Sequence, residues 1–416
     1  MFRCAILLTA VVLTSLTALG QEIPLIRLAG AAEQIGTAWG ELNKENIVRD
    51  MEADFLKRAE AAGISREALL QRANGYVRIV EQIAPHWLAE ARAIARAAGV
   101  PEDMYIAYRT GSVRDRFLHE CTSYAVSRDP EQGGAILFHK NRDNRDRQQA
   151  AYIVDSSLEG INKFLTVSNA TAINCSMMVN EKGLAGSADY PVEHTRKNDP
   201  NALRPEPADP QWRGLMSGAI LRYIAERAAN CEEALAILED FIAKGYYAGG
   251  KVNGNHWLFV DRDGRILEAS NNSRHVVSKF HTQKAYFSRL DNSAAARRLR
   301  DSAEPIDFHL FHNVSRDRSI CFNSSISGMT VEIDPNHPDM LTCAWISLPA
   351  HAVAFPVLMG QAGTPSCLVD GSAYQLGKAS PRQVSRWEAM EKTMHAGKER
   401  MKQELAASIA AGNPHD

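Results

Sequence analysis

Apolar residues recur at helical spacing through the first quarter of the chain. Between residues 33 and 98 they fall three or four positions apart, as Trp87, Ala91 and Ile94 do, and this spacing places them on one face of an α-helix. Pro85 suits the first turn of the last helix, and the Gly-Val-Pro sequence at 99–101 ends it. The pattern predicts a helical N-terminal region of about 100 residues.

At Cys121 the pattern changes to an alternation of apolar and polar residues. Two such runs, 121–126 and 135–138, flank the turn-forming sequence Asp-Pro-Glu-Gln-Gly-Gly at 129–134, and Lys-Asn-Arg-Asp follows at 140–143. This order predicts a β-hairpin. The start of one strand lies beside the end of its antiparallel partner, so we expect Cys121 and Asp143 at the same end of the hairpin.

The rest of the chain mixes strand and helix patterns. We expect strands at 151–154, 164–167 and 172–179, a strand, turn and strand at 180–191, a loop at 192–212, helices at 214–243, hairpins at 255–269 and 324–346, and an amphipathic helix at 381–411. Antiparallel sheets covered by helices follow from this order, so the predicted fold class is α+β.

Composition and charge narrow the class of protein. The 416 residues, 45% of them hydrophobic, can bury one large core, and a net charge of -2 implies neither a nucleic acid nor an anionic membrane as partner. Residues 1–20 carry Arg3, an apolar run and a small-residue end at Ala18-Leu19-Gly20. This pattern is typical of a secretory signal peptide, so we expect a secreted or periplasmic protein without a membrane span.

Cysteine and histidine usage bears on the chemistry. Six cysteines follow the signal segment; we expect most to be buried small hydrophobes, with a disulfide from Cys321 to Cys343 or Cys367 as the leading candidate if one exists. The sequence has no phosphate loop, zinc-binding His-Glu-x-x-His or serine nucleophile elbow. We therefore expect neither a metal nor an organic cofactor.

Cys121 is the candidate nucleophile. A thiol with a pKa of about 8.5 is only slightly ionised at neutral pH and needs a base, yet no histidine is placed to serve it. An α-amino group on Cys121 itself, with a pKa of about 7.7–8.0, would suit that role. This mechanism requires cleavage of the Glu120–Cys121 bond. The competing interpretation is a buried core cysteine.

The Cys-Thr-Ser start at 121–123 and the Asn-x-Asp turn at 141–143 resemble the cysteine N-terminal nucleophile hydrolases. Over the chain after the signal segment, the sequence looks like the penicillin acyltransferase family, and more distantly like choloylglycine hydrolase and acid ceramidase. The resemblance implies a four-layer αββα sandwich, self-cleavage before Cys121, a helical propeptide or small subunit at 21–120, and a catalytic domain at 121–416 with a C-terminal helix.

The resemblance also assigns roles to residues. Asp143 would orient the freed amino group, and Gln283 stands where the family has an oxyanion-binding asparagine; Asn253, Asn255, Asn271 and Asn272 are the alternatives. Lys140 stands where bile-salt and ceramide enzymes have arginine, and Glu120 where the acyltransferases commonly have glycine. Further candidates are Arg297 as support for the nucleophile, Asp189 and Tyr190 as substrate-binding residues, and Ser327 as a residue linked to activity.

Together these features predict an exported, self-processing cysteine amidohydrolase or acyltransferase. It would cleave a linear amide in a small-molecule substrate through an acyl-enzyme on Cys121. One alternative is a dipeptidase-like relative. Another is a catalytically inactive family member that acts as a binding protein, favoured by the departures at Glu120, Lys140 and Gln283. Substrate identity and oligomeric state stay open, because pocket shape decides the first.

Overall fold

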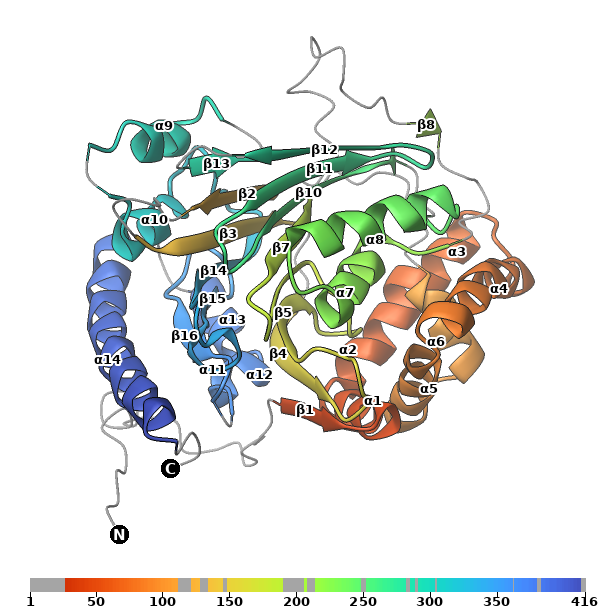
Figure 1. The fold of residues 1–416 in the computed structure, drawn as a ribbon. Coiled ribbons are helices and arrows are strands. Elements are labelled where there is room, and N and C mark those ends of the chain that lie inside the picture. Colours follow the sequence, from red (N-terminus) through yellow and green to blue (C-terminus); the bar gives the residue numbers. More distant parts are fainter. Residues whose placement is uncertain are drawn as a thin grey trace.

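The computed structural model describes residues 27–110, 121–127, 134–144, 148–189, 206–207, 214–247, 252–281, 285–288, 291–303, 305–361, 363–379 and 383–412. Two β-sheets pack face to face, and helices cover the outer face of each (Figure 1). A core of buried side chains, among them Phe138, Leu165 and Met329, fills the space between the sheets. The α+β class and the four-layer αββα order are therefore confirmed.

The first sheet has eight strands, and one of them comes from the N-terminal region. Their order is β1 (Arg27–Gly30), β4 (Gln149–Ser156), β5 (Phe164–Asn169), β6 (Met177–Asn180), β7 (Ala185–Asp189), β10 (Asn255–Val260), β11 (Ile266–Asn271) and β12 (Val276–His281). Only β1 runs parallel to its neighbour; the other pairs are antiparallel. Residues ahead of Cys121 thus complete one edge of this sheet.

The second sheet has six antiparallel strands and carries the hairpin of Cys121. Their order is β13 (Ala285–Phe287), β2 (Cys121–Val126), β3 (Ile136–Asp143), β14 (Ser325–Ile333), β15 (Cys343–Ser347) and β16 (Phe355–Leu358). A short separate pair joins β8 (Glu206–Pro207) to β9 (Val252–Asn253). The hairpins predicted at Cys121, at 255–269 and at 324–346 are confirmed.

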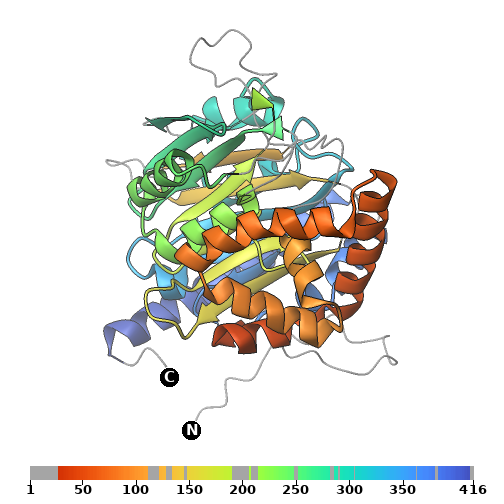
Figure 2. The ribbon, with the colours of Figure 1, turned by 90° about the vertical axis from the view of Figure 1, so that its right-hand side faces the viewer.

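The helices of the N-terminal region cover the first sheet, as Figure 2 shows from the side. They are α1 (Ala32–Leu42), α2 (Lys44–Arg49), the π-helical segment η1 (Asp50–Leu56), α3 (Lys57–Ala61), α4 (Arg66–Ile83), α5 (His86–Ala98) and α6 (Glu102–Arg109), joined by α7 (Ser217–Arg227) and α8 (Cys231–Ala243). They share one core with the sheet, in which the Trp39 and Tyr152 rings lie 4.4 Å apart.

Two glycines let α1 and α5 approach closely. A Cβ at Gly36 would lie 2.3 Å from the carbonyl oxygen of Glu90, and one at Gly40 would lie 2.6 Å from that of Ile94. No real side chain tolerates such distances, so the Gly-x-x-x-Gly spacing is a packing requirement.

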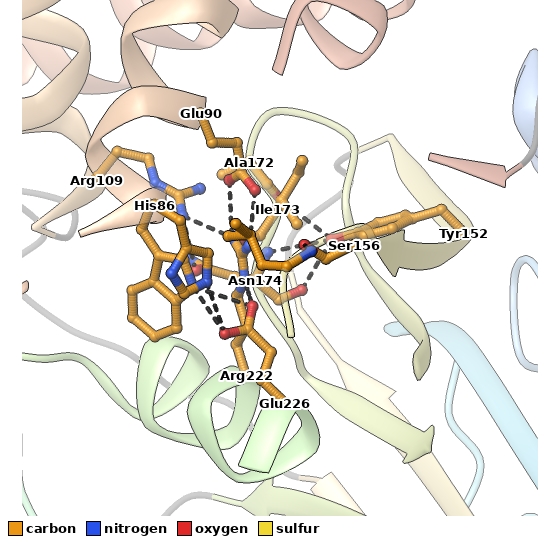
Figure 3. A network of polar contacts seen from close by, with 12 residues as sticks. His86, Glu90, Arg109, Tyr152, Ser156, Ala172, Ile173, Asn174, Arg222 and Glu226 are labelled. Atoms are coloured by element: carbon orange, nitrogen blue, oxygen red, sulfur yellow. Dashed lines mark hydrogen bonds and ion pairs between the residues drawn. The ribbon is translucent and has the colours of Figure 1, made fainter. Parts of the chain in front are cut away.

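A buried polar network joins the N-terminal helices to α7 (Figure 3). Arg222 donates two hydrogen bonds to Glu90, at 2.7 and 2.6 Å, and one to Glu226 at 2.8 Å. Trp87 also donates to Glu226, at 3.0 Å, and His86 lies 3.0 Å from it. Burial alone would raise the pKa of Glu226, but the Arg222 charge and the His86 contact outweigh it and lower that pKa.

Three helices cover the second sheet from its other side: α9 (Ala294–Arg300), α10 (Phe308–Val314) and α14 (Val384–Ala410). Shorter helices are α11 (Pro338–Leu341), α12 (Ser366–Val369) and α13 (Ser372–Ala379). The predicted C-terminal helix is confirmed in α14, where Glu391 pairs with Arg316 and Lys398 with Glu332. Among the described residues, no helix has the length and apolar character that crossing a membrane requires.

The disulfide prediction is wrong. All six cysteines after the signal segment are free, and five of them are buried. Cys343 belongs to a cluster with Phe308 and Trp345, and burial raises the pKa of its thiol above the usual range. Cys343 therefore acts as a small apolar side chain, as was expected for most of the cysteines.

Candidate active site

Cys121 opens β2 and faces the space between the two sheets. Ser123 shares this face, because side chains alternate along a strand, and its hydroxyl lies 2.8 Å from that of Ser187 on the first sheet. Tyr124 belongs to the opposite face, where it packs under α9 and α10. The Cys121 side chain is therefore enclosed between the sheets, with only 7% of the residue exposed.

Lys140 and Asp189 form a buried ion pair across the same space. The Lys140 ammonium lies 2.9 Å from Asp189 Oδ1 and donates to the carbonyl oxygens of Ser176, at 2.9 Å, and Ala188, at 2.6 Å. Burial favours a neutral Asp189, but Lys140 and a hydrogen bond from Ser123 outweigh it and lower the Asp189 pKa. These contacts hold the Lys140 ammonium in place beside β2, and Asp189 neutralises its charge.

Ser288 connects this ion pair to the backbone near the nucleophile. Its hydroxyl donates to Asp189 Oδ2 at 3.1 Å and accepts from the Ser123 N–H at 3.2 Å, while the Ser288 N–H donates to the Ser123 carbonyl at 2.8 Å. Sequence reasoning missed Ser288 and Ser123. The alternation along 121–126 could have identified Ser123, but no local signal identifies Ser288.

Arg142 is the residue directly opposite Cys121 in the hairpin. Its Nη1 donates to the side-chain oxygens of Gln149, at 2.9 Å, and Asn169, at 3.0 Å, which belong to the first sheet. The residue is half-buried. Sequence reasoning treated position 142 only as the middle of a turn motif. Paired positions share a face, so the hairpin register was the signal that could have identified it.

Asp143 ends β3 at the same end of the hairpin as Cys121. It pairs with Ser325 of β14, and the Ser325 hydroxyl donates to its Oδ1. Alternation places its side chain on the face of β3 opposite to that of Arg142, yet its charge still raises the pKa of the Cys121 thiol. Ser327, another candidate, donates from its hydroxyl to Gln149 at 3.1 Å.

The electrostatic surroundings keep the Cys121 thiol protonated. Burial raises the pKa of the thiol, and the negative charges of Asp189 and Asp143 raise it further. The positive charges of Lys140 and Arg142 lower it, but by less, so the pKa remains raised. His139 lies on the other face of β3, where it contacts Thr330 and Asn141.

Burial lowers the pKa of His139 to about 3, so it stays neutral. Within the described part of the chain, no histidine forms a hydrogen bond with the Cys121 thiol. A buried thiol of this kind needs a base from elsewhere.

Among the described candidates, Arg297 does not come to Cys121. Arg297 is exposed on α9, which packs on the outer face of the second sheet, and it donates to the carbonyl of Asn292. The resemblance assigned it to the nucleophile, but the sheet separates the two. Glu120, Tyr190 and Gln283 lie outside the described residues. Among the alternative asparagines, Asn271 accepts a hydrogen bond from Trp257 Nε1 at 2.7 Å.

One group of side chains has ligand atoms close enough for a metal ion, and it lies away from Cys121. Glu332, His395 and Glu399 form it, among the described residues, at the contact of α14 with β14. The Lys398 ammonium lies 2.5 Å from Glu332 and 2.6 Å from Glu399. A side-chain cation therefore already neutralises this group.

Comparison with known proteins supports the resemblance seen in the sequence. The family described as acyl-coenzyme A:6-aminopenicillanic acid acyl-transferase matches residues 130–302. No curated protein sequence matches the chain.

Among solved structures, penicillin V acylase from Agrobacterium tumefaciens is 14% identical, with a TM-score of 0.40 over 58% of this chain and 87% of its own. A conjugated bile acid hydrolase variant from Clostridium perfringens is 13% identical, with a TM-score of 0.39 over 57% of this chain and 92% of its own.

A Caenorhabditis elegans ortholog of N-acylethanolamine-hydrolysing acid amidase is 9% identical, with a TM-score of 0.34 over 53% of this chain and 94% of its own. The recognition made from sequence is confirmed by the family match. Family and layer order together indicate an amidohydrolase or acyltransferase of the N-terminal nucleophile type.

Proposed function

Because residues 130–302 match the acyl-coenzyme A:6-aminopenicillanic acid acyl-transferase family, we propose that this protein is a self-processing cysteine amidohydrolase or acyltransferase. Cys121 is its nucleophile, and its substrate is a linear amide. The observation that supports this most is the position of Cys121: it begins a strand, lies directly opposite Arg142 in the hairpin, and has a raised pKa that demands a base.

The base in this proposal is the amino group of Cys121, freed by cleavage of the Glu120–Cys121 bond. It takes the thiol proton, and the sulfur attacks the carbonyl carbon of the amide. The carbon–nitrogen bond then breaks, the amine leaves with that proton, and a thioester remains on Cys121. Water releases the acid, whereas an acceptor amine takes the acyl group instead.

Neighbouring residues assist these steps. Lys140 and Arg142 favour the thiolate electrostatically, while Asp143 orients the amino group from the same end of the hairpin. Gln283 is the candidate oxyanion donor, and the loss of one such donor typically costs about 2.7–4 kcal/mol. Tyr190 and Asp189 belong to the substrate side of the site in this proposal.

The segment at 21–120 stays attached after cleavage as the small subunit. Strand β1 lies within the first sheet, and the Arg222 network joins α5 to α7. Removing both would expose the apolar core that the helices share with the sheet. The segment at 1–20 directs export and is removed.

A panel of linear amides with aromatic, steroid and fatty acyl groups tests the activity. We expect at least one to be cleaved, and Cys121→Ser to lower its rate by about a thousandfold or more. Cys367→Ser, at a half-buried cysteine in α12, is the matched control and should leave the rate unchanged. A transient acyl mass on the peptide of Cys121 identifies the thioester. Cleavage that persists in Cys121→Ser would exclude this nucleophile.

The alternative is an inactive family member that binds an amide without cleaving it. The departures from the family pattern at Glu120, Lys140 and Gln283 favour it. Lys140 nevertheless reaches across to the first sheet with three oxygen partners, so the substitution of lysine for arginine keeps a cation at this place. Absence of turnover across the panel, with a measured affinity for one amide, would favour this alternative.

A further inference from the structure

The loop between β5 and β6 (residues 170–176, called the β5–β6 loop) contacts both cations of the candidate active site from its two ends. Before it, Asn169 ends β5, and its side-chain oxygen accepts a hydrogen bond from Arg142 Nη1 at 3.0 Å. At the far end, the Ser176 carbonyl accepts a hydrogen bond from the Lys140 ammonium at 2.9 Å. The path of this loop therefore helps to determine where the two cations lie.

The middle of the β5–β6 loop is held by α6, the last helix of the N-terminal region. The Tyr105 hydroxyl donates to the Thr171 carbonyl at 2.9 Å. Arg109 Nη2 donates to the Ile173 carbonyl at 2.9 Å and to the Asn174 side-chain oxygen at 3.1 Å (Figure 3). Both donor residues are buried. Three acceptors of the loop thus have a donor on this one helix.

Residues that follow Cys121 in the chain hold the same loop, but at other atoms. Arg222 Nη1 shares the Ile173 carbonyl with α6, at 3.0 Å. The Tyr152 hydroxyl donates to the Asn174 carbonyl at 2.9 Å and accepts from the Asn174 N–H at 3.1 Å. Among the described residues, the Thr171 carbonyl and the Asn174 side-chain oxygen are bonded from α6 alone. The first half of the loop therefore depends most on α6.

The polar character of this contact requires an explanation. Taking a guanidinium out of water costs free energy, and an apolar side chain at Arg109 could fill the same space without that cost. Hydrogen bonds differ from apolar contacts because they have a preferred distance and direction. Donors from α6 therefore fix the path of the β5–β6 loop more closely than apolar packing would.

We propose that Tyr105 and Arg109 are positioning residues for the reaction at Cys121. They hold the β5–β6 loop, and the two ends of this loop hold Lys140 and Arg142 beside the nucleophile. This inference rests on the proposed function and gives the N-terminal segment a part in it beyond stability. Both cations lower the pKa of the thiol from their present places. A displaced loop would weaken their effect on the thiolate.

The ionisation of the Cys121 thiol tests this positioning without any substrate. Carbon NMR of protein labelled at the cysteine Cβ gives the midpoint, and the Cys121 signal is the one missing from Cys121→Ala. We expect Arg109→Met to raise the midpoint by about 0.5–1 pH unit, equivalent to a loss of about three- to tenfold in thiolate below the midpoint. Arg109→Lys should recover part of this shift, because lysine keeps a charged donor. Tyr105→Phe should cause a smaller shift in the same direction.

Two control variants separate positioning from a general loss of stability. Gly40→Ala presses α1 against the Ile94 carbonyl on α5, so it should weaken the N-terminal region and leave the midpoint unchanged. Tyr223→Phe, on α7, removes a hydroxyl that forms no hydrogen bond with a described residue. It should leave the midpoint unchanged as well. Tyr105→Phe changes a single oxygen atom, so it provides the answer in case Arg109→Met does not fold.

The kinetics of a cleaved amide give the second test. We expect Arg109→Met to lower kcat about three- to tenfold near neutral pH, with KM nearly unchanged. The pH profile of kcat should move upward together with the midpoint from NMR. A contact with the substrate would instead raise KM. Gly40→Ala should keep the pH profile of the wild type.

The outcomes separate this inference from the proposed function. Equal midpoints in wild type, Arg109→Met and Tyr105→Phe would overturn the inference, since α6 would then only stabilise the fold. A shift in Gly40→Ala as large as that in Arg109→Met would overturn it too. A shift confined to the α6 variants in a protein that cleaves no amide would leave the positioning intact and remove the enzymatic proposal. Cleavage through Cys121 that neither α6 variant affects would keep the proposed function and remove this inference.

Discussion

Two arginines lie inside this molecule in opposite circumstances. Arg222 joins the N-terminal helices to α7 and is matched by two carboxylates, those of Glu90 and Glu226. Arg142 joins the two sheets beside Cys121, and its hydrogen-bond partners among the described residues are the amide oxygens of Gln149 and Asn169. Both contacts connect layers of the fold, but within the described parts of the chain a carboxylate neutralises Arg222 and none neutralises Arg142.

The two arginines therefore contribute differently to the stability of the fold. The Arg222 network is complete, so breaking it leaves buried carboxylates without a partner. The contacts of Arg142 with described residues orient its guanidinium without neutralising it. The charges of the N-terminal interface are thus matched, whereas the described residues at the end of the hairpin at Cys121 leave the charge of Arg142 unmatched.

Arg222→Met should have the largest effect on stability. It leaves Glu90 and Glu226 buried and unpaired, so we expect a loss of about 3–5 kcal/mol in the free energy of unfolding. Urea unfolding of the uncleaved Cys121→Ala chain measures this. Arg227→Met changes an exposed arginine on the same helix and should stay within about 0.5 kcal/mol. Equal effects at the two positions would remove the contrast.

Acid should weaken a second neutralised interface, that of α14 with the second sheet. Burial would raise the pKa of Glu332, but its hydrogen bond with His395 and the charge of Lys398 outweigh this and lower the pKa from 4.5 to about 2. Because the pKa of Glu332 is lower in the folded chain than in the unfolded chain, its ionised form stabilises the fold. This stabilisation is complete above about pH 4.5 and is lost as the pH falls through about 2.

Glu332→Gln should remove that part of the acid dependence, worth roughly 3 kcal/mol at most. Unfolding midpoints measured from pH 6 to pH 2 should then fall less steeply in the variant than in the wild type. Parallel curves would show that Glu332 does not carry this dependence.

Gly36→Ala should disturb the N-terminal interface without changing any charge. The added Cβ would meet the Glu90 carbonyl at 2.3 Å, so α1 must shift away from α5, at a cost of about 1–3 kcal/mol. Gly397→Ala in α14 has no such contact and should instead stabilise the helix by about 0.5–1 kcal/mol. Thermal unfolding distinguishes the two, and stabilisation by both would refute close packing at Gly36.

Arg142→Gln should change stability least. Two neutral hydrogen bonds with described residues are at stake and glutamine can replace one, so we expect a loss below about 1.5 kcal/mol. Urea unfolding measures this, and a loss as large as that of Arg222→Met would make Arg142 a structural residue like Arg222.

Local patterns in the sequence predicted much of the fold. The alternation around Cys121 predicted the β2–β3 hairpin, and the pattern at 255–269, which has an Asp-Gly turn at 263–264, predicted the β10–β11 hairpin. Helical periodicity gave α4, α5 and α14. These elements follow from hydrogen bonding and side-chain direction within short segments, so no knowledge of tertiary packing was needed.

The partners of the site were harder to predict because they come from different sheets. Lys140 was assigned by resemblance, but its pairing with Asp189 and the role of Ser288 depend on how β3, β7 and β13 face one another. Arg297 shows the converse: a motif placed it at the nucleophile, whereas the second sheet lies between them. The expected disulfide does not form. The sequence could not exclude it, because the number of residues between two cysteines does not give the distance between them in the fold.

Cleavage before Cys121 is the central claim, and intact mass with N-terminal sequencing of the purified protein tests it most directly, beside the Cys121→Ala variant. We predict that the wild type separates into two chains, one ending at Glu120 and the other beginning at Cys121, while the variant stays whole. A wild type that remains a single uncleaved chain yet hydrolyses an amide through Cys121 would contradict the free-amine mechanism.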